Sequence, residues 1–424
     1  LFPYTTLFRS ENNDLSKSSE SITVDESIAE DILATQADTA VVVGTVSDYL
    51  TAKGDAKLYN INLPAGVYLQ AQLTTPANAD LDYDLYLLDA EGNILTGSDY
   101  YTYINGTAGT LPEALGYITS GDTATYYLYV LASEGGSVSE SFTLDYSVST
   151  ACDSYEIDES VRQALAFTYG AGGAYIESRN LSSPIDNDWY VITVPSSRIY
   201  DKLKISATTA STNTCSVEVY QNVASEGYQM KRVGSGNTIS VSSGKYYIRV
   251  SNAKTMENFD DLDIQNYKLS ITPILKATGI VITDLKGSEG LNKVVNYPGY
   301  GAHFRTQGSG TLTVYGVLTA TDSSTGVTYA VGGEQINGLY YSPAWEANNT
   351  SANAIRRGTG TTDSSGKFEI DISLPPGIGV YSYYGSTSTH YFDICGVSVS
   401  PSDDSSISAS ETIFHLAYTM YHPF

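Results

Sequence analysis

Short stretches in which hydrophobic and polar residues alternate run along most of the chain. Residues 57–63 read Lys-Leu-Tyr-Asn-Ile-Asn-Leu, so that Tyr59, Ile61 and Leu63 share one side. Because successive side chains of a β-strand point to opposite faces, this alternation predicts half-buried strands. Gly, Pro, Asn and Asp end the runs at a spacing typical of antiparallel sandwiches. The pattern therefore predicts an all-β protein made of β-sandwiches.

A second block of alternating stretches repeats the first. In the first block we expect strands at 41–46, 57–63, 67–74, 83–88, 125–132 and 141–147, and in the second at 174–178, 188–194, 203–208, 216–221, 244–251 and 266–272. Five landmarks recur in the same order, with offsets of about 130 residues that drift slowly along the chain. This repetition indicates a duplicated module with insertions and deletions in its loops.

Each copy of the module is expected to open with one short helix. Asp25 and Asp158 have the chemistry of helix N-caps and stand at matching positions. A short apolar stripe follows each of them. Its members are Ile28, Ile32 and Leu33 in the first copy and Val161, Ala164 and Leu165 in the second.

The repeat stops after Pro273, and a third, unrelated block follows. Its alternating stretches flank two Asp-Ser-Ser turns that end at Gly326 and Gly366, where glycine permits a positive φ. This pattern predicts a third sandwich. The expected domains are 22–150, 151–275 and 276–424, preceded by a disordered, polar lead-in at 11–21. Residues 1–10 resemble the translation of a common sequencing adapter and are interpreted as an artefact, so that the natural sequence would extend upstream.

The composition narrows the classes of partner. The chain has 47 acidic and 22 basic residues, a net charge of −25, and such a field repels a phosphate backbone, so nucleic-acid binding is not expected. No apolar stretch has the length of a membrane span. Cys152 and Cys215 share the second block and are candidates for a disulfide, which would leave Cys395 unpaired; the sequence leaves their pairing open.

The repeated block resembles the bacterial pre-peptidase C-terminal domain, a jelly-roll-like sandwich attached to many secreted peptidases and surface proteins. In the second copy the resemblance rests on 153–158, on Asp-Asn-Asp-Trp-Tyr at 186–190, on Val194-Pro195 and on 244–250. In the first copy it rests on Gly54-Asp55, 63–66, 79–86 and 126–130. The first copy lacks the Asp-Trp-Tyr run, and the second lacks the Asp-rich strand. The resemblance implies an extracellular bacterial protein, secreted or attached to the cell surface.

The third block resembles carboxypeptidase-regulatory-like or bacterial immunoglobulin-like repeats, through 361–370 and Leu374-Pro375. The resemblance implies an immunoglobulin- or transthyretin-like sandwich that acts as a spacer or adhesive module.

Catalytic motifs are missing from the sequence. It contains no Gly-x-Ser-x-Gly elbow, no His-Glu-x-x-His pair and no phosphate-binding glycine loop. The histidines all lie in the third block, and nothing in their spacing selects a triad. We therefore expect a non-catalytic protein.

Acidic clusters are the first kind of candidate site. Asp80, Asp82 and Asp84 would share one face of a strand, with Asp89 close behind, and converging carboxylates suit calcium. Asp186 and Asp188, with Glu156 and Asp158, form a similar cluster in the second copy. The alternative is an exposed acidic loop that leads into a half-buried strand.

Tyrosine clusters are the second kind, because an exposed ring with a polar tip can stack on sugars or line a protein interface. The candidates are Tyr100, Tyr101, Tyr103, Tyr340, Tyr341, Trp345, Tyr383 and Tyr384. The alternative is that alternate tyrosines pack in the cores.

The sequence thus favours non-catalytic modules that bind an extracellular polysaccharide or protein, or that position a partner domain. One alternative is the accessory region of a secreted peptidase whose catalytic domain lies outside this sequence. A structural stalk is another.

Overall fold

The described residues of the chain form β-strands joined by turns and loops, together with a short 3₁₀ turn. This computed structural model describes residues 19–21, 41–78, 80–99, 101–104, 107–108, 111–150, 152–209, 215–223, 229–235, 237–252, 265–288, 292–296, 302–305, 310–343, 355–375 and 393–416. The all-β prediction is confirmed. The chain divides into unit 1, with Leu1–Ser196 and Lys202–Pro273, and unit 2, with Ser197–Asp201 and Ile274–Phe424.

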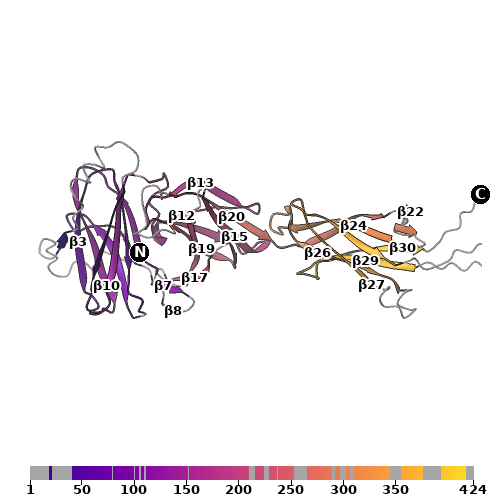
Figure 1. Ribbon diagram of the computed structural model, residues 1–424, viewed down its shortest axis with the longest axis horizontal. Coiled ribbons are helices and arrows are strands. Elements are labelled where there is room, and N and C mark those ends of the chain that lie inside the picture. Colours follow the sequence, from indigo (N-terminus) through magenta and orange to yellow (C-terminus); the bar gives the residue numbers. More distant parts are fainter. Residues whose placement is uncertain are drawn as a thin grey trace, which may run out of the picture. The chain divides into compact units, whose positions relative to one another are not determined.

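The first sandwich of unit 1 pairs a five-stranded sheet with a four-stranded one. The five-stranded sheet has the order β1 (Ser19–Ser21), β3 (Ala56–Leu63), β10 (Ala124–Glu134), β5 (Asp82–Leu88), β6 (Ile94–Ser98). The four-stranded sheet has the order β2 (Val41–Asp48), β11 (Phe142–Ser149), β4 (Tyr68–Thr74), β9 (Glu113–Ile118). Figure 1 shows β3 and β10 side by side, as their antiparallel register requires. Tyr59, Ile61 and Leu63 point into the core between the sheets, as their alternation predicts.

The second sandwich of unit 1 repeats this strand order. Its larger sheet runs β12 (Leu165–Ala166), β14 (Asn187–Val194), β19 (Gly244–Asn252), β16 (Cys215–Asn222), β17 (Gln229–Ser235), β7 (Tyr101–Ile104), β8 (Thr107–Ala108). Its smaller sheet runs β13 (Ala174–Leu181), β20 (Gln265–Leu275), β15 (Tyr200–Thr209), β18 (Thr238–Ser240). The parallel edge pair β1 with β3 recurs as β12 with β14. Every strand predicted in the two blocks overlaps an observed strand.

The two sandwiches of unit 1 share structure. The β7–β8 hairpin comes from the first block, yet β7 pairs in parallel with β17 of the second sheet, Tyr101 opposite Gln229. Leu111 of the first block belongs to the same buried cluster as Trp189 and Val161 of the second. The sandwiches are therefore joined by backbone pairing and by packing.

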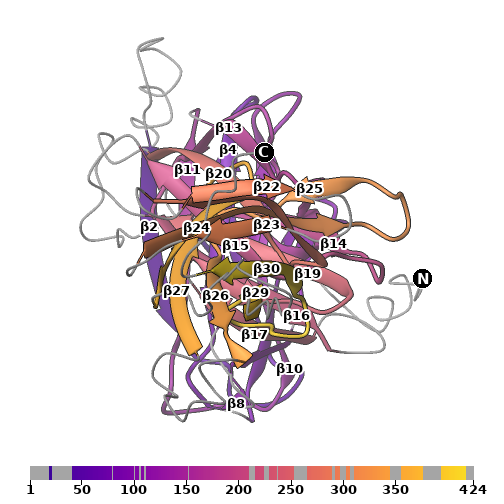
Figure 2. The ribbon, with the colours of Figure 1, turned by 90° about the vertical axis from the view of Figure 1, so that its right-hand side faces the viewer.

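Unit 2 is a third sandwich. One sheet contains β21 (Gly279–Gly287), β24 (Gly310–Thr321), β25 (Thr328–Ala330) and β28 (Lys367–Leu374), with β24 at its centre. The other runs β22 (Asn292–Asn296), β23 (Ala302–Arg305), β30 (Ala409–Leu416), β29 (Asp393–Pro401), β26 (Gln335–Tyr341), β27 (Ile355–Thr361). Figure 2 shows β30, β29, β26 and β27 side by side. Both predicted turns end at glycines with positive φ, 72° at Gly326 and 75° at Gly366.

Two expectations about the starts of the modules were wrong. Asp158 does not cap a helix, because residues 161–163 form only a single 3₁₀ turn, η1 (Val161–Gln163), and the Asp158 carboxylate binds Arg179 instead. The end of the expected disordered lead-in is ordered, since Ser19–Ser21 pairs with the edge of β3 through backbone groups that need no apolar side chain. The helix expected after Asp25 and the adapter-like residues 1–10 lie outside the described residues.

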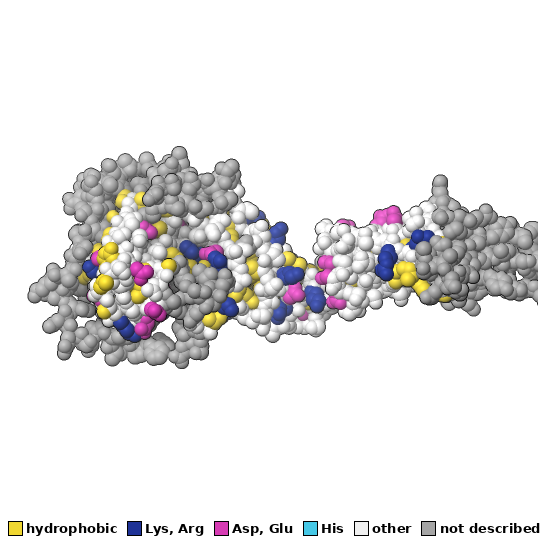
Figure 3. All heavy atoms as spheres, turned by 60° about the horizontal axis from the view of Figure 1, so that its bottom comes forward, with side chains coloured by type: hydrophobic (Ala, Val, Ile, Leu, Met, Phe, Trp, Pro, Cys, Tyr) yellow, Lys and Arg dark blue, Asp and Glu magenta, His cyan; other side chains and the backbone are white. Residues whose placement is uncertain are grey.

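The remaining fold-level expectations concern the cysteines, charge and membranes. Cys152, Cys215 and Cys395 are free thiols, so the candidate disulfide does not form. On the face shown in Figure 3, basic side chains lie beside acidic ones, and its described surface carries no broad basic patch. Across the part of the chain that the structure describes, no helix is long and apolar enough to cross a membrane.

Candidate metal centre

Three carboxylates converge where the second sandwich begins. Asp186 precedes β14 and Asp188 lies within it, so the two share a side, and Glu156 comes from the segment that enters the sandwich. One oxygen from each of these residues lies within 4.8 Å of the others. Asp186 and Asp188 are fully buried. The structure thus gathers the second acidic cluster that the sequence predicts.

Local hydrogen bonds hold Asp186 in place but leave one of its oxygens unpaired. Its Oδ2 accepts bonds from the Ser182 amide and, at 2.8 Å, from the Ser182 hydroxyl. Its Oδ1 is buried without a hydrogen-bond partner, and so is Oε1 of Glu156. The bonds to Oδ2 fix the position of the carboxylate and therefore of Oδ1. A buried polar atom without a partner costs free energy, so Oδ1 is a site where a donor or a cation would stabilise the fold.

Arg179 neutralises part of the surrounding acidity. Its guanidinium is fully buried and pairs with Asp153 at 2.6 Å, with Asp188 Oδ1 at 2.9 Å, and with Asp158. Its Nε donates to the Tyr190 hydroxyl at 2.7 Å. One guanidinium cannot match all of these carboxylates and Glu156, Glu159 and Asp186 as well, so a deficit of positive charge remains.

The first sandwich reaches into the cluster through β4. The Tyr68 hydroxyl donates to Glu156 Oε2 at 2.8 Å and also contacts Glu159. Gln70 Nε2 donates to Glu159 Oε1 at 2.7 Å, and the other Glu159 oxygen accepts the Asn187 amide at 3.0 Å. The acidic segment therefore binds both sandwiches.

Burial is the main cause of raised pKa values among the carboxyl groups of Glu156, Asp158, Glu159, Asp186 and Asp188. Burial is the largest cause for Glu156, whose pKa rises to about 9, followed by repulsion from Asp186 and Asp188. Burial followed by neighbouring carboxylates also lifts the pKa values of Asp158, Glu159 and Asp188 well above their ordinary ranges. Burial raises the pKa of Asp186 too, although hydrogen bonds from Ser182 oppose the rise. The cluster must therefore hold protons or a cation at neutral pH.

The donor set suits a hard divalent cation. Calcium binds carboxylate oxygens at roughly 2.3–2.6 Å. The 4.8 Å limit on the oxygen separations is about twice this distance, so one ion can reach all three oxygens. Glu156, Asp186 and Asp188 would hold the ion and supply part of the six to eight oxygens that calcium takes. The bound ion would supply the positive charge that Arg179 does not.

The first predicted acidic cluster is arranged differently. Among the described residues, Asp80, Asp82, Asp84 and Asp89 form no such group of three convergent carboxylates. Asp84 is buried, accepts hydrogen bonds from Ser133 and Tyr86, and has a pKa raised to about 7, mainly by burial. Burial raises the pKa of Asp82 to about 6. Burial opposes ionisation of Asp89, but hydrogen bonds from Asn93 and neighbouring backbone amides together lower its pKa.

Of the tyrosine and tryptophan candidates for a ligand surface, the structure describes the side chains of Tyr340 and Tyr341. Tyr340 as a surface candidate is wrong, because its ring is fully buried in the core of unit 2, with its hydroxyl 3.1 Å from Cys395 Sγ. Tyr341 is half-buried. Tyr101 and Tyr103 lie in β7, but their side chains are outside the described residues, as are Tyr100, Trp345, Tyr383 and Tyr384.

Sequence reasoning missed Glu159, Arg179, Tyr68 and Gln70. Arg179 is inside because β13 has a register shift between Ile176 and Arg179, with Ser178 at a φ of 62°. Such a bulge re-aims the next side chain. Tyr68 and Gln70 meet the cluster only through packing of the two sandwiches, which leaves no local sequence signal.

Comparison with known proteins identifies no family for this chain. No family model matches it. The uncharacterized protein YlqB of Bacillus subtilis (strain 168) is 36% identical over 74 residues, 18% of this chain and 46% of YlqB. The chain thus spans less than half the length of this curated relative.

Solved structures give only distant likenesses. PliG, a periplasmic lysozyme inhibitor of g-type lysozyme from Aeromonas hydrophila, matches with a TM-score of 0.18 and 10% identity over 31% of this chain and 96% of its own. The CUB1-EGF-CUB2 domain of human MASP-1/3 matches with a TM-score of 0.17 and 11% identity over 55% of this chain and 99% of its own. The tandem CBM22-1-CBM22-2 domain of Paenibacillus barcinonensis Xyn10C matches with a TM-score of 0.16 and 10% identity. The match covers 56% of this chain and 94% of the tandem domain. Scores this low carry no argument about function.

Proposed function

We propose that this chain is a non-catalytic binding and accessory region of a secreted or cell-surface bacterial protein, and that its second sandwich binds calcium. Glu156, Asp186 and Asp188 would hold the ion. The observation that carries the calcium proposal is the fully buried Asp186, whose Oδ1 lacks a hydrogen-bond partner beside two further carboxylates.

The ion would act by stabilising the fold. A ligand that binds only the native state raises stability by RT ln(1 + [L]/Kd), about 2.7 kcal/mol at one hundred times Kd. The segment 156–159 also binds Tyr68 and Gln70 of the first sandwich. We call the contacts of Tyr68 and Gln70 with Glu156 and Glu159 the joint between the sandwiches. Calcium bound here would therefore stabilise both sandwiches and this joint.

The partner of such a region would be an extracellular polysaccharide or protein. The strongly acidic chain, with a net charge of −25, disfavours nucleic acid. Loops held by a rigid sandwich are common positions for binding residues, which supports recognition of a partner at the surface.

Thermal unfolding of the full chain tests the calcium proposal. Calcium at about 1–10 mM, roughly tenfold above the dissociation constants of about 0.1–1 mM of extracellular modules, should raise the melting temperature of unit 1, and excess chelator should reverse the rise. Asp186→Asn should abolish the shift. Asp84→Asn is the matched control, because Asp84 is also a buried aspartate with a raised pKa but lies in the other acidic cluster.

The outcomes separate the two clusters. A shift that survives Asp186→Asn but disappears in Asp84→Asn would move the site to the first sandwich. The absence of any shift in the unmodified chain at 10 mM calcium would overturn the calcium proposal.

A further inference from the structure

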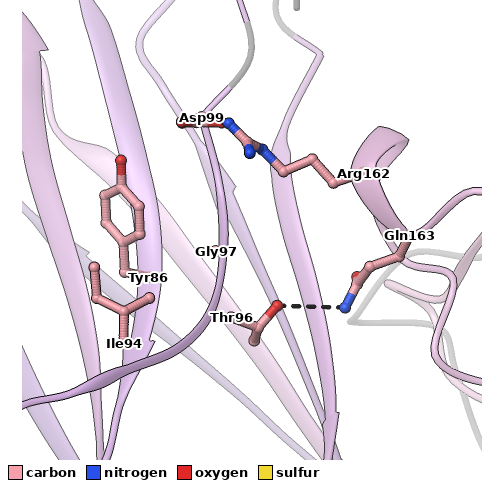
Figure 4. Close-up of a pocket in the computed structure, with 7 residues that line it drawn as sticks. All are labelled: Tyr86, Ile94, Thr96, Gly97, Asp99, Arg162 and Gln163. Atoms are coloured by element: carbon pink, nitrogen blue, oxygen red, sulfur yellow. Dashed lines mark hydrogen bonds and ion pairs between the residues drawn. The ribbon is translucent and has the colours of Figure 1, made fainter. Parts of the chain in front are cut away.

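A pocket of about 370 Å³ lies between the two sandwiches of unit 1, and none of the carboxylates of the acidic cluster is among its lining residues. Figure 4 shows its lining: Tyr86 from β5, Ile94, Thr96 and Gly97 from β6, Asp99 just beyond, and Arg162 and Gln163 from η1. Its volume lies at the low end of the range for small-molecule sites, about 300–1,000 Å³. The pocket is therefore large enough for a ligand of one or two rings.

One side of the pocket is apolar. Tyr86 and Ile94 lie next to each other there (Figure 4). Gly97 permits the close approach of the tyrosine ring, since a Cβ at this position would lie 2.4 Å from Tyr86 Cδ1. An aromatic ring beside an aliphatic side chain offers a surface for the C–H face of a sugar ring, the kind of contact in which tyrosine loses little entropy.

The opposite side is polar but balanced in charge. Arg162 Nε donates to Asp99 Oδ1 at 2.8 Å, and the two side chains form an ion pair. A paired guanidinium and carboxylate give a charged ligand no net attraction, while they still present donors and acceptors side by side. This arrangement suits a neutral ligand.

The remaining polar groups are suited to hydroxyls. Gln163 Nε2 donates to Thr96 Oγ1 at 3.3 Å (Figure 4). It also donates to the Gly116 carbonyl at 3.4 Å, and both contacts are long. An amide and a hydroxyl each donate and accept, as adjacent sugar hydroxyls do. Long contacts are exchanged for ligand bonds at little cost.

We infer that this pocket is a binding site for a neutral carbohydrate, with one ring seated against Tyr86 and Ile94 and its hydroxyls bound by Thr96 and Gln163. The inference rests on the proposal that the chain is a binding region, and it adds the ligand class and the site. Residues 161–163 follow Glu159 after one residue, Ser160, and Tyr68 and Gln70 hold Glu159, so these contacts position the η1 wall of the pocket.

Calorimetric titration of the full chain in calcium tests the inference. The probes are the neutral disaccharides cellobiose, maltose, xylobiose and chitobiose, with a uronic-acid disaccharide as the charged comparison. We expect at least one neutral sugar to bind and the charged one to bind more weakly. Thr96→Val and Gln163→Ala should each weaken binding about tenfold, because each leaves a ligand hydroxyl without its partner.

Thr125→Val is the matched control, since Thr125 is a half-buried threonine of the same sheet whose hydroxyl bonds Asn62. It should leave binding unchanged. Hydrogen exchange of the unmodified chain should show protection by the sugar in β6 and around 160–163. Protection elsewhere, equal affinities in all variants, or no binding of any neutral probe at 10 mM would overturn the inference. If the carbohydrate inference fails but the calcium proposal holds, calcium will still raise the melting temperature of unit 1.

Discussion

Gln70 Nε2 in the first sandwich donates a 2.7 Å hydrogen bond to Glu159 Oε1 in the second, and both side chains are buried. The contact places a strand of one sandwich against the acidic segment of the other. Glu159 is three residues from Glu156 of the candidate metal centre, and one residue separates it from η1, which carries Arg162 and Gln163. The joint between the sandwiches thus connects the metal centre with the pocket.

Tyr68 makes the second contact across this joint, and removing its hydroxyl measures how much the contact contributes to stability. Tyr68→Phe removes the donor to Glu156 Oε2 and one of the two donors to Glu159 Oε1, which keeps its bond from Gln70. It should destabilise unit 1 by about 1–3 kcal/mol, since it leaves Glu156 Oε2 without this partner. The matched variant is Tyr83→Phe, which removes a buried hydroxyl that donates to the Leu50 carbonyl at 3.3 Å within the first sandwich. Urea unfolding should show a smaller loss for Tyr83→Phe; equal losses would contradict the role of the joint.

The raised carboxyl pKa values predict an unusual dependence of stability on pH. A carboxyl group whose pKa is higher in the folded state binds more protons there, so its contribution is complete below the unfolded pKa and is lost as pH rises through the folded pKa. For Glu156 this window runs from 4.5 to about 9. In chelator, the melting temperature of unit 1 should therefore fall between pH 5 and pH 9.

Calcium should counteract this fall, because the ion binds the deprotonated carboxylates and its stabilising effect grows with pH. The difference between melting temperatures with calcium and with chelator should be small at pH 5 and large at pH 8. Asp82 and Asp84, with pKa values of about 6 and about 7, add a fall that calcium does not reverse. A calcium effect that shrinks as pH rises would contradict the assignment.

Arg179 is expected to be essential for the fold of the second sandwich. Arg179→Met leaves Asp153, Asp158 and Asp188 buried without their cation and should cost about 3–5 kcal/mol at pH 7. The loss should be smaller at pH 5, where Asp158 and Asp188 take up protons, because burial raises the pKa values of both. Urea unfolding followed by the fluorescence of the buried Trp189 measures it.

Arg232→Met is the control for this substitution. Arg232 pairs with Glu218 at 2.7 Å, but its side chain is 32% exposed, so its loss should cost at most about 1 kcal/mol. Calcium should also restore more stability to Arg179→Met than to the unmodified chain, because the ion replaces the missing charge. If both arginine variants lose the same stability, the buried network is not what holds this sandwich.

The strands could be predicted because alternation is a local property. The runs at 57–63 and 188–194 carry their inward faces in their own residues, and both are strands. The sequence did not predict β6 or β9. The run Ile-Leu-Thr-Gly-Ser of β6 has no alternation of hydrophobic and polar residues. In β9, Gly116 interrupts the run where the strand packs against Glu159 of the second sandwich. The pairing of β7 with β17 depends on contact between two sandwiches, which no local pattern encodes.

The candidate site divides in the same way. Asp186 and Asp188 could be found because they are two residues apart on one strand and share a side. Arg179 could not, since a bulge turns it inward. Tyr340 was misplaced because a Tyr-Tyr pair in a strand puts one ring on each face, and the sequence does not say which face is the core. In β26 the buried face belongs to Ile336, Gly338 and Tyr340.

The position of Tyr340 in the core leads to a last prediction. Tyr340→Ala should destabilise unit 2 by about 3–5 kcal/mol, as truncation of a buried aromatic side chain does. Tyr340→Phe keeps the ring and removes only the hydroxyl near Cys395, so it should cost about 1.5 kcal/mol or less. Calorimetry should show the loss in the transition that calcium does not shift, because Tyr340 and the metal centre belong to different units. A Tyr340→Ala protein with unchanged transitions and reduced binding to a sugar would instead place this ring on a ligand surface.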